Sequence, residues 1–136
     1  MWATTYQRIV TDPSMIHDPA GAYAHGIKVG ETLYVAGQVA MNTEGQIVHA
    51  NDPQGQFRLI MKNIVTIVET AGGQVDDIVK LLAFMENMDH LEDFQVVLRE
   101  TFKNGFPTVT LVEVSRLAVK DMLMECEALA IIPAAR

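Results

Sequence analysis

Two carboxylates flank the only cysteine of the chain, in the stretch MECEALA at residues 124–130. This stretch lies in an apolar run that predicts a strand over residues 122–132, where charged side chains are seldom buried without a partner. Because side chains alternate along a strand, Glu125 and Glu127 share one face and Cys126 lies on the other. Either the carboxylates form a solvated edge or an ion pair with a neighbouring chain, or Glu125 lies in a partly dry cleft. In such a cleft its pKa would be raised, and it could act as a general base or acid.

Tyr23 and two threonines are further candidates. Tyr23 lies on a predicted loop, where a phenol can close over a pocket or only pack its ring with the hydroxyl in water. Thr108 and Thr110 lie in a predicted strand, where β-branched residues usually serve strand propensity. Their hydroxyls could also bind a neutral polar substrate.

The remaining reactive side chains predict no cofactor. Cys126 is expected to be a buried, inert thiol, because no basic residues near it in the sequence lower its pKa. His17, His25, His49 and His90 lack metal-ligand spacing, so we expect structural or solvent-exposed roles and no metal site. His25 adjoins the loop of Tyr23.

Two helices are expected to support these residues. The first spans residues 52–73, with Asp52 as the cap, Pro53 at the first helical position and Gly72 and Gly73 at the end. Its apolar face is Phe57, Ile60, Met61, Ile64, Val68 and Ala71. The second spans residues 88–102 and precedes Gly105 and Pro107. It has Asp89 as a possible cap, and its inward residues are Leu91, Phe94, Val97 and Leu98.

Six apolar runs predict strands. They lie near residues 4–10, 25–29, 32–40, 76–87, 108–116 and 122–132. The order of elements predicts an α+β fold, with a six-stranded, mainly antiparallel sheet and two helices on one face. Several predicted strands have apolar residues at both odd and even positions, so both of their faces are apolar. Two helices cover only one face of such a sheet. We therefore expect an obligate oligomer in which another copy covers the second face.

Length and composition narrow the class of protein. The 136 residues predict a single domain over 1–136, and no segment approaches the roughly 18 apolar residues of a membrane span. The formal charge is −7, without clustered basic residues, so nucleic acid is not an expected partner. The single cysteine and the N-terminal composition favour a cytoplasmic location.

Five segments together resemble the RidA family, also called YjgF, over about residues Gly21 to Ile132. The segments are AGAYAHGIKVGETLYVAGQ, the pattern Gln56, Asn63 and Ala71–Gly73, VDDIVKLLAF, FPTVTLVEVSRLA and MECEALA. The resemblance implies a chorismate-mutase-like fold and a homotrimer with small-molecule sites in the clefts between subunits. It also implies hydrolysis of enamines and imines, such as 2-aminoacrylate and 2-iminopropionate, to 2-keto acids and ammonia without a metal or organic cofactor.

The resemblance also assigns residues. The substrate-facing tyrosine of the family matches Tyr23, and its water-orienting glutamate matches Glu125. Gly37 and Gln38 match the end of a substrate-binding strand, although the family's serine before them is Ala36 here.

One family position departs from the pattern of the active deaminases. These enzymes place an arginine two residues after the proline to bind the substrate carboxylate, and this chain has Val109, followed by Thr110. Loss of such a charge partner costs on the order of 3 kcal/mol, or about a hundredfold in affinity. Neither Arg99 nor Arg116 is expected to replace it.

Two functions follow from this reading. The leading one is a deaminase of small imines or enamines, with Glu125 and Tyr23 as catalytic residues and Val109, Thr110, Gly37 and Gln38 near the substrate. The alternative is a trimer that has lost the deaminase activity and binds or senses a small metabolite. The ribonuclease activity attributed to some relatives is disfavoured by the acidic charge.

Overall fold

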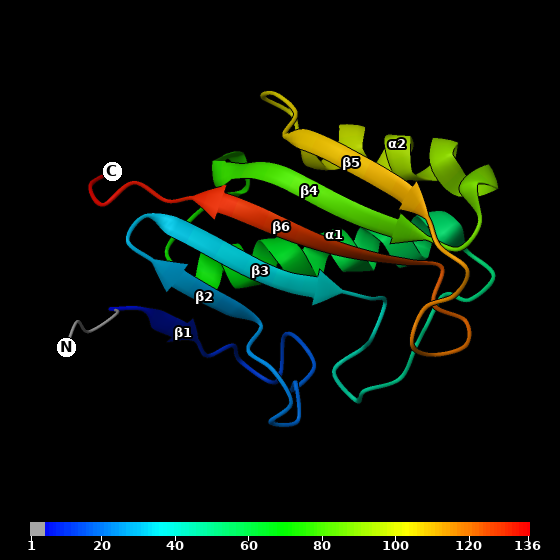
Figure 1. Cartoon of the computed structure of the whole chain (residues 1–136), viewed down its shortest axis with the longest axis horizontal. Coiled ribbons are helices and arrows are strands. Elements are labelled where there is room, and N and C mark those ends of the chain that lie inside the picture. Colours follow the sequence, from blue (N-terminus) through cyan, green and yellow to red (C-terminus); the bar gives the residue numbers. More distant parts are fainter. Residues whose placement is uncertain (1–4) are drawn as a thin grey trace.

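The computed structural model describes residues 5–136, and in this range six strands and two α-helices form two layers (Figure 1). The elements are β1 (Gln7–Ile9), β2 (Gly26–Val29), β3 (Thr32–Gln38), α1 (Pro53–Thr70), η1 (Val75–Asp77), β4 (Ile78–Met85), η2 (Met88–His90), α2 (Leu91–Thr101), β5 (Thr108–Glu113) and β6 (Met124–Ile131). The strand order is β1-β2-β3-β6-β4-β5. Only the pair β4 and β5 is parallel in this sheet of the described chain, and both helices lie on one face. The predicted α+β architecture is confirmed.

Helix α1 begins where the sequence predicts and ends at Thr70, three residues before the predicted end. Asp52 accepts a hydrogen bond from the backbone N–H of Gly55 at 3.0 Å, and Pro53 opens the first turn. At the other end, the N–H of Gly73 donates to the carbonyl of Val68 at 2.9 Å. Gly72 has a φ of 93°, which permits the chain to leave the helix.

The predicted cap of the second helix is wrong. Asp89 lies within the short turn η2, and the side chain of Asn87 accepts a hydrogen bond from the N–H of Asp89 at 2.9 Å. Asn87 therefore starts the turn that leads into α2. The inward face is also shorter than expected, because Leu91 is 38% exposed, whereas Phe94, Val97 and Leu98 are buried.

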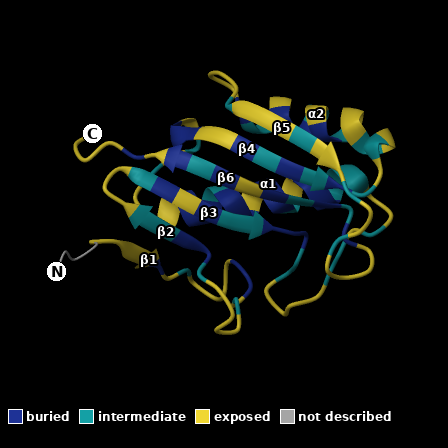
Figure 2. Ribbon diagram, in the orientation of Figure 1, coloured by how far each residue is buried: buried dark blue, intermediate teal, exposed yellow. Residues whose placement is uncertain are grey.

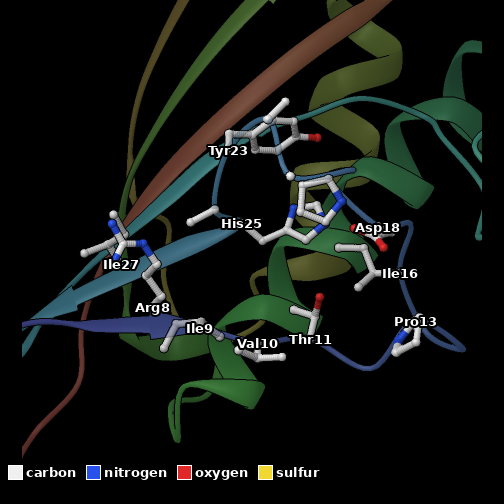
Figure 3. Close-up of a pocket in the computed structure, with 14 residues that line it drawn as sticks. Arg8, Ile9, Val10, Thr11, Pro13, Ile16, Asp18, Tyr23, His25 and Ile27 are labelled. Carbon is white, nitrogen blue, oxygen red and sulfur yellow. The ribbon is translucent and has the colours of Figure 1, made fainter.

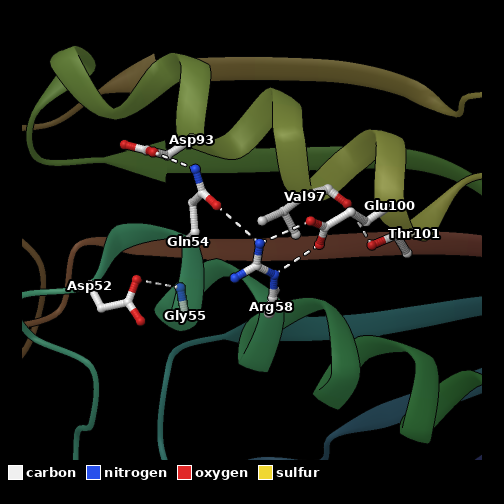
Figure 4. A network of polar contacts seen from close by, with 8 residues as sticks. All are labelled: Asp52, Gln54, Gly55, Arg58, Asp93, Val97, Glu100 and Thr101. Atoms are coloured by element: carbon white, nitrogen blue, oxygen red, sulfur yellow. Dashed lines mark hydrogen bonds and ion pairs between the residues drawn. The ribbon is translucent and has the colours of Figure 1, made fainter.

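Polar side chains join the two helices at their exposed side (Figure 4). Arg58 donates from Nε to Glu100 at 2.8 Å and from Nη2 to Gln54 at 3.0 Å. Gln54 in turn donates to Asp93 on α2 at 3.0 Å. These contacts fix the two helices side by side on the sheet.

The strands are shorter than their apolar runs. The expected strand at residues 4–10 is observed as β1 alone, and residue 4 lies outside the described residues. Before β4, Asp77 accepts a hydrogen bond from the N–H of Gln74 at 2.9 Å, which holds residues 75–77 in the turn η1. The fifth strand ends at Glu113, so Arg116 lies in the following loop and not in the strand where it was expected.

The two faces of the sheet differ in burial (Figure 2). On β6, residues that face the helices are buried, whereas Glu125, Glu127, Leu129 and Ile131 are half-buried or exposed. Tyr34 pairs with Leu129 across the outer face and is 55% exposed. The second apolar face that the sequence predicts is therefore present, and no helix among the described residues covers it. None of the helices within residues 5–136 is long and apolar enough to cross a membrane.

Candidate active site

Glu125 lies on the outer face of β6 beside an irregular part of β3. The register between β3 and β6 shifts between Val35 and Gln38. Gly37 lies in this bulge, and a Cβ atom at its position would be only 2.9 Å from the carboxyl carbon of Glu125. The absence of a side chain at Gly37 thus lets the carboxylate pack against the backbone of β3.

The surroundings of Glu125 favour its protonated form. Partial burial, and secondarily the negative charge of Glu127 on the same face, raise the pKa of Glu125 above its ordinary value. Glu127 is exposed. Cys126 is fully buried on the helix side, as predicted, and this burial raises the pKa of its thiol.

Tyr23 lies on the loop before β2, with its hydroxyl 3.2 Å from Nε2 of His17. Its ring packs edge to face against His25, with the centroids 5.7 Å apart. Burial raises the pKa of Tyr23, and the negative charge of Glu125 raises it further. Tyr23 is therefore a neutral phenol within electrostatic range of the Glu125 carboxylate.

Gln38 connects the Tyr23 loop to β3. Its side chain is fully buried, donates to the carbonyl of Ala36 at 3.1 Å and lies 3.2 Å from Nδ1 of His25. The other ring nitrogen of His25 lies 2.7 Å from the carbonyl of His17. Gln38 thus supports the loop from within, while Gly37 contacts Glu125 directly.

A cavity of about 720 Å³ opens on the other side of the same loop (Figure 3). Tyr23 and His25 contribute to its wall together with Ile16, and its charged lining residues are Arg8 and Asp18. Glu125 is not among the lining residues. Tyr23 is therefore the candidate residue that contributes to the wall of this cavity.

Val109 and Thr110 lie apart from the other candidates. Both belong to the edge strand β5, and β4 separates β5 from β6. Directly paired residues share a face, so Thr110, beside Leu82, lies on the Glu125 face, and Val109, beside Leu81, lies on the helix side. Within one chain, β5 does not reach Glu125.

His17 is the side chain at this site that the sequence did not single out. Its side chain is buried, with a relative exposure of 3%, and the folding of the loop brings its ring against the hydroxyl of Tyr23. The order of residues in HDPAGAYAHG gives no periodic signal for this contact. Among residues 5–136, no group of three or more histidine, cysteine, aspartate or glutamate side chains is arranged to hold a metal ion.

Comparison with known proteins agrees with this architecture. The family described as Endoribonuclease L-PSP matches residues 15–132, which is most of the chain. The chain belongs to this family, the RidA/YjgF family. A RutC family protein of Sulfurisphaera tokodaii is 39% identical over 107 residues, which cover 79% of this chain and 85% of that protein. The 2-iminobutanoate/2-iminopropanoate deaminase of Dermatophagoides farinae is 28% identical over 126 residues, which cover 93% and 97%.

A solved family structure has the same fold. Escherichia coli TdcF with bound serine superposes with a TM-score of 0.83 and is 29% identical, and the match covers 93% of this chain and all of that one. The RidA/YjgF fold predicted from the sequence is therefore confirmed.

Proposed function

We propose that this RidA-family chain is a hydrolase of C–N bonds that converts small imines or enamines to a keto compound and ammonia. The observation that carries the proposal is the half-buried Glu125, whose pKa is raised and whose carboxylate lies beside Gly37 and near Tyr23. The 2-iminobutanoate/2-iminopropanoate deaminase among its relatives supports this choice of substrate class.

The proposed reaction needs only water and proton transfer. Water attacks the imine carbon while Glu125 accepts a proton from it, so a C–O bond forms, the C=N π pair moves to nitrogen, and nitrogen takes a proton from solvent. Protonated Glu125 then returns its proton to the amine, the C–N bond breaks, and ammonia leaves. The hydroxyl loses its proton to solvent as the C=O bond forms. An enamine enters the same sequence after protonation at carbon, and Tyr23 positions the substrate.

The complete site in this proposal is shared between copies of a homotrimer. Val109 and Thr110 lie on the edge strand, and the Glu125 face of the sheet is uncovered in one chain. Another copy could therefore bring its β5 to the cleft of Glu125 and Tyr23. With Val109 on this edge strand where the active deaminases have arginine, the strand supplies no guanidinium to the cleft, so a substrate carboxylate would remain unpaired there.

Val109 also favours a second candidate function. A trimer with this apolar side chain could bind a small metabolite without converting it, because the group that would neutralise a carboxylate is absent. The family description as an endoribonuclease is less well supported by this chain, whose formal charge is −7.

Imine hydrolysis tests the proposal directly. 2-Iminopropanoate is generated in situ with an amino-acid oxidase and catalase, and its decay is followed with wild type, Glu125→Gln and Glu127→Gln. We expect wild type to accelerate decay and Glu125→Gln to lower the rate by about 10²- to 10⁴-fold, the range of general acid–base catalysis. Glu127→Gln is the matched control on the same face and keeps most of the activity.

The Val109→Arg variant separates the two candidate functions. If wild type is inactive and Val109→Arg hydrolyses the imine, the chain is a metabolite-binding member and the deaminase proposal fails for this substrate. If wild type is active and Glu125→Gln is equally active, the role proposed for Glu125 is wrong.

A further inference from the structure

A buried chain of hydrogen bonds runs from β3 to the hydroxyl of Tyr23. It passes from Gln38 to His25, from His25 to the backbone of His17, and from the ring of His17 to Tyr23, over distances of 3.2, 2.7 and 3.2 Å. His17, His25 and Gln38 are each at most 3% exposed. The first two bonds are therefore shielded from bulk water, whereas the third ends on Tyr23, which is 47% exposed.

The first two bonds have one possible direction. A backbone carbonyl only accepts, so Nε2 of His25 must carry the hydrogen that it donates to His17. In neutral His25, Nδ1 is then an acceptor and receives the hydrogen bond from the amide of Gln38. Gln38 uses its second N–H toward Ala36. All ring and amide donors of these two side chains are thus paired.

The third bond depends on the tautomer of His17. Burial, followed by the positive charge of His25 when protonated, lowers the pKa of His17, so the ring is neutral near neutral pH. Its Nδ1 is buried and has no hydrogen-bond partner among the described residues. If Nδ1 carried the hydrogen, the structure would contain an orphaned buried N–H, which folded proteins rarely tolerate. The better tautomer has the hydrogen on Nε2, which donates to the oxygen of Tyr23.

Electrostatics supports the same direction. The charge of Glu125 acts on the hydroxyl of Tyr23 strongly enough to raise its pKa. A nearby negative charge attracts the hydrogen end of an O–H dipole. An orientation in which Tyr23 accepts from His17 and directs its own hydrogen toward the Glu125 side therefore has the lower energy.

We infer that His17 is a positioning residue that holds Tyr23 as a hydrogen-bond donor toward the proposed site. A phenol fixed in this way donates to an acceptor on the ligand, such as a carboxylate or keto oxygen. It would thereby supply part of the recognition that Val109 does not provide. The role in catalysis rests on the proposed function, whereas the tautomer of His17 does not.

The tautomer can be measured in the wild-type protein. Long-range ¹H–¹⁵N NMR at neutral pH distinguishes the protonated from the bare ring nitrogen of His17, and His17→Gln gives the assignment. We expect hydrogen on Nε2 and none on Nδ1. Hydrogen on Nδ1 overturns the inference, whatever the activity of the protein. Hydrogen on Nε2 without any imine hydrolysis supports the inference and argues against the proposed function.

A double-mutant cycle tests the effect on Tyr23. The variants are His17→Leu, His17→Gln, Tyr23→Phe and the double variant His17→Leu/Tyr23→Phe, with His90→Leu in the turn η2 as the histidine control. We expect His17→Leu to lower kcat/KM by about fivefold to tenfold, the effect of losing one hydrogen bond, and His17→Gln to restore part of it. The double variant should be no worse than Tyr23→Phe, because both changes remove the same interaction. Effects that multiply would overturn the assignment of His17 to Tyr23.

The pKa of Tyr23 provides a readout independent of turnover. A hydrogen bond donated to the phenol oxygen stabilises the phenolate, so its removal raises the pKa. We expect titration of the Tyr23 ¹³Cζ resonance to shift to higher pH in His17→Leu and to remain in place in His90→Leu. An unchanged titration in folded His17→Leu would contradict the donor role.

Discussion

Glu125 combines two features that suit a general base. Partial burial disfavours its charge, and Glu127 on the same face adds repulsion, so both effects raise its pKa. Gly37 brings the backbone of β3 against the carboxyl group and restricts its position. A base held in this way is desolvated on one side while its other side faces the outer surface of the sheet.

The charge of Glu127 should therefore appear in the pH dependence of the proposed reaction. A carboxylate base acts when deprotonated, so kcat/KM rises with pH through the pKa of Glu125. Replacing Glu127 by Gln removes the repulsion and lowers that pKa, which moves the acidic limb to lower pH. The shift should be small, because the charge of the exposed Glu127 is screened by solvent and salt.

The pH profile of kcat/KM for 2-iminopropanoate measures this shift. Glu44→Gln makes the same change in net charge on an exposed turn and should leave the limb in place. A limb that moves to higher pH in Glu127→Gln, or moves equally in both variants, would be inconsistent with direct repulsion between Glu127 and Glu125.

At the scale of elements, α1 supports the strand that carries Glu125. Gln56 is fully buried on this helix and donates to the carbonyls of Val48 and Asp121 at 3.1 and 2.9 Å. Its side-chain oxygen accepts from the N–H of Leu123 at 2.6 Å. One side chain thus pairs backbone groups from two loops, and the second of these loops leads directly into β6.

Loss of Gln56 should destabilise the fold more than loss of a surface glutamine. Gln56→Leu leaves an N–H and two carbonyls in part-buried positions without this partner, which costs about 1–3 kcal/mol. Urea unfolding at a fixed protein concentration measures the change in free energy. Gln54→Leu, in the exposed network of Figure 4, is the control and should have a small effect. Similar losses in both variants would show that the buried pairing contributes little.

The sequence predicts elements better than it predicts their contacts. The apolar period and the cap at Asp52 locate α1 to within three residues, because both signals are local. The cap of the second helix was wrong because Asn87, two residues earlier, offers a competing side chain. The strands were predicted too long because apolar residues continue beyond the last ladder pair. His17 and Gly37 depend on a folded loop and a register shift, which no local pattern encodes.

At the scale of the whole molecule, no helix of residues 5–136 covers one face of the sheet. Tyr34 and Leu129 pair on this face, and Leu82 and Phe84 on β4 pair with the two glutamates of β6. The face therefore combines apolar side chains with the candidate catalytic carboxylate. An interface that covered it would bury apolar surface and, at the same time, narrow the approach to Glu125.

Tyr34 is the position at which we expect this interface to be most sensitive. Because Tyr34 is 55% exposed in one chain, Tyr34→Arg should leave the fold of the chain intact. In a trimer that covers the face, the arginine would lose its hydration, and an ion pair with Glu127 on the same face would offset only part of that cost, so assembly should weaken by about tenfold or more. Native mass spectrometry and sedimentation velocity measure the assembly, and circular dichroism checks the fold.

Leu91→Arg on α2, where Leu91 is 38% exposed, is the matched control and should remain trimeric. A wild type that is monomeric at micromolar concentration, or a Tyr34→Arg variant that assembles normally, would place the interface elsewhere and remove β5 of another copy from the site of Glu125.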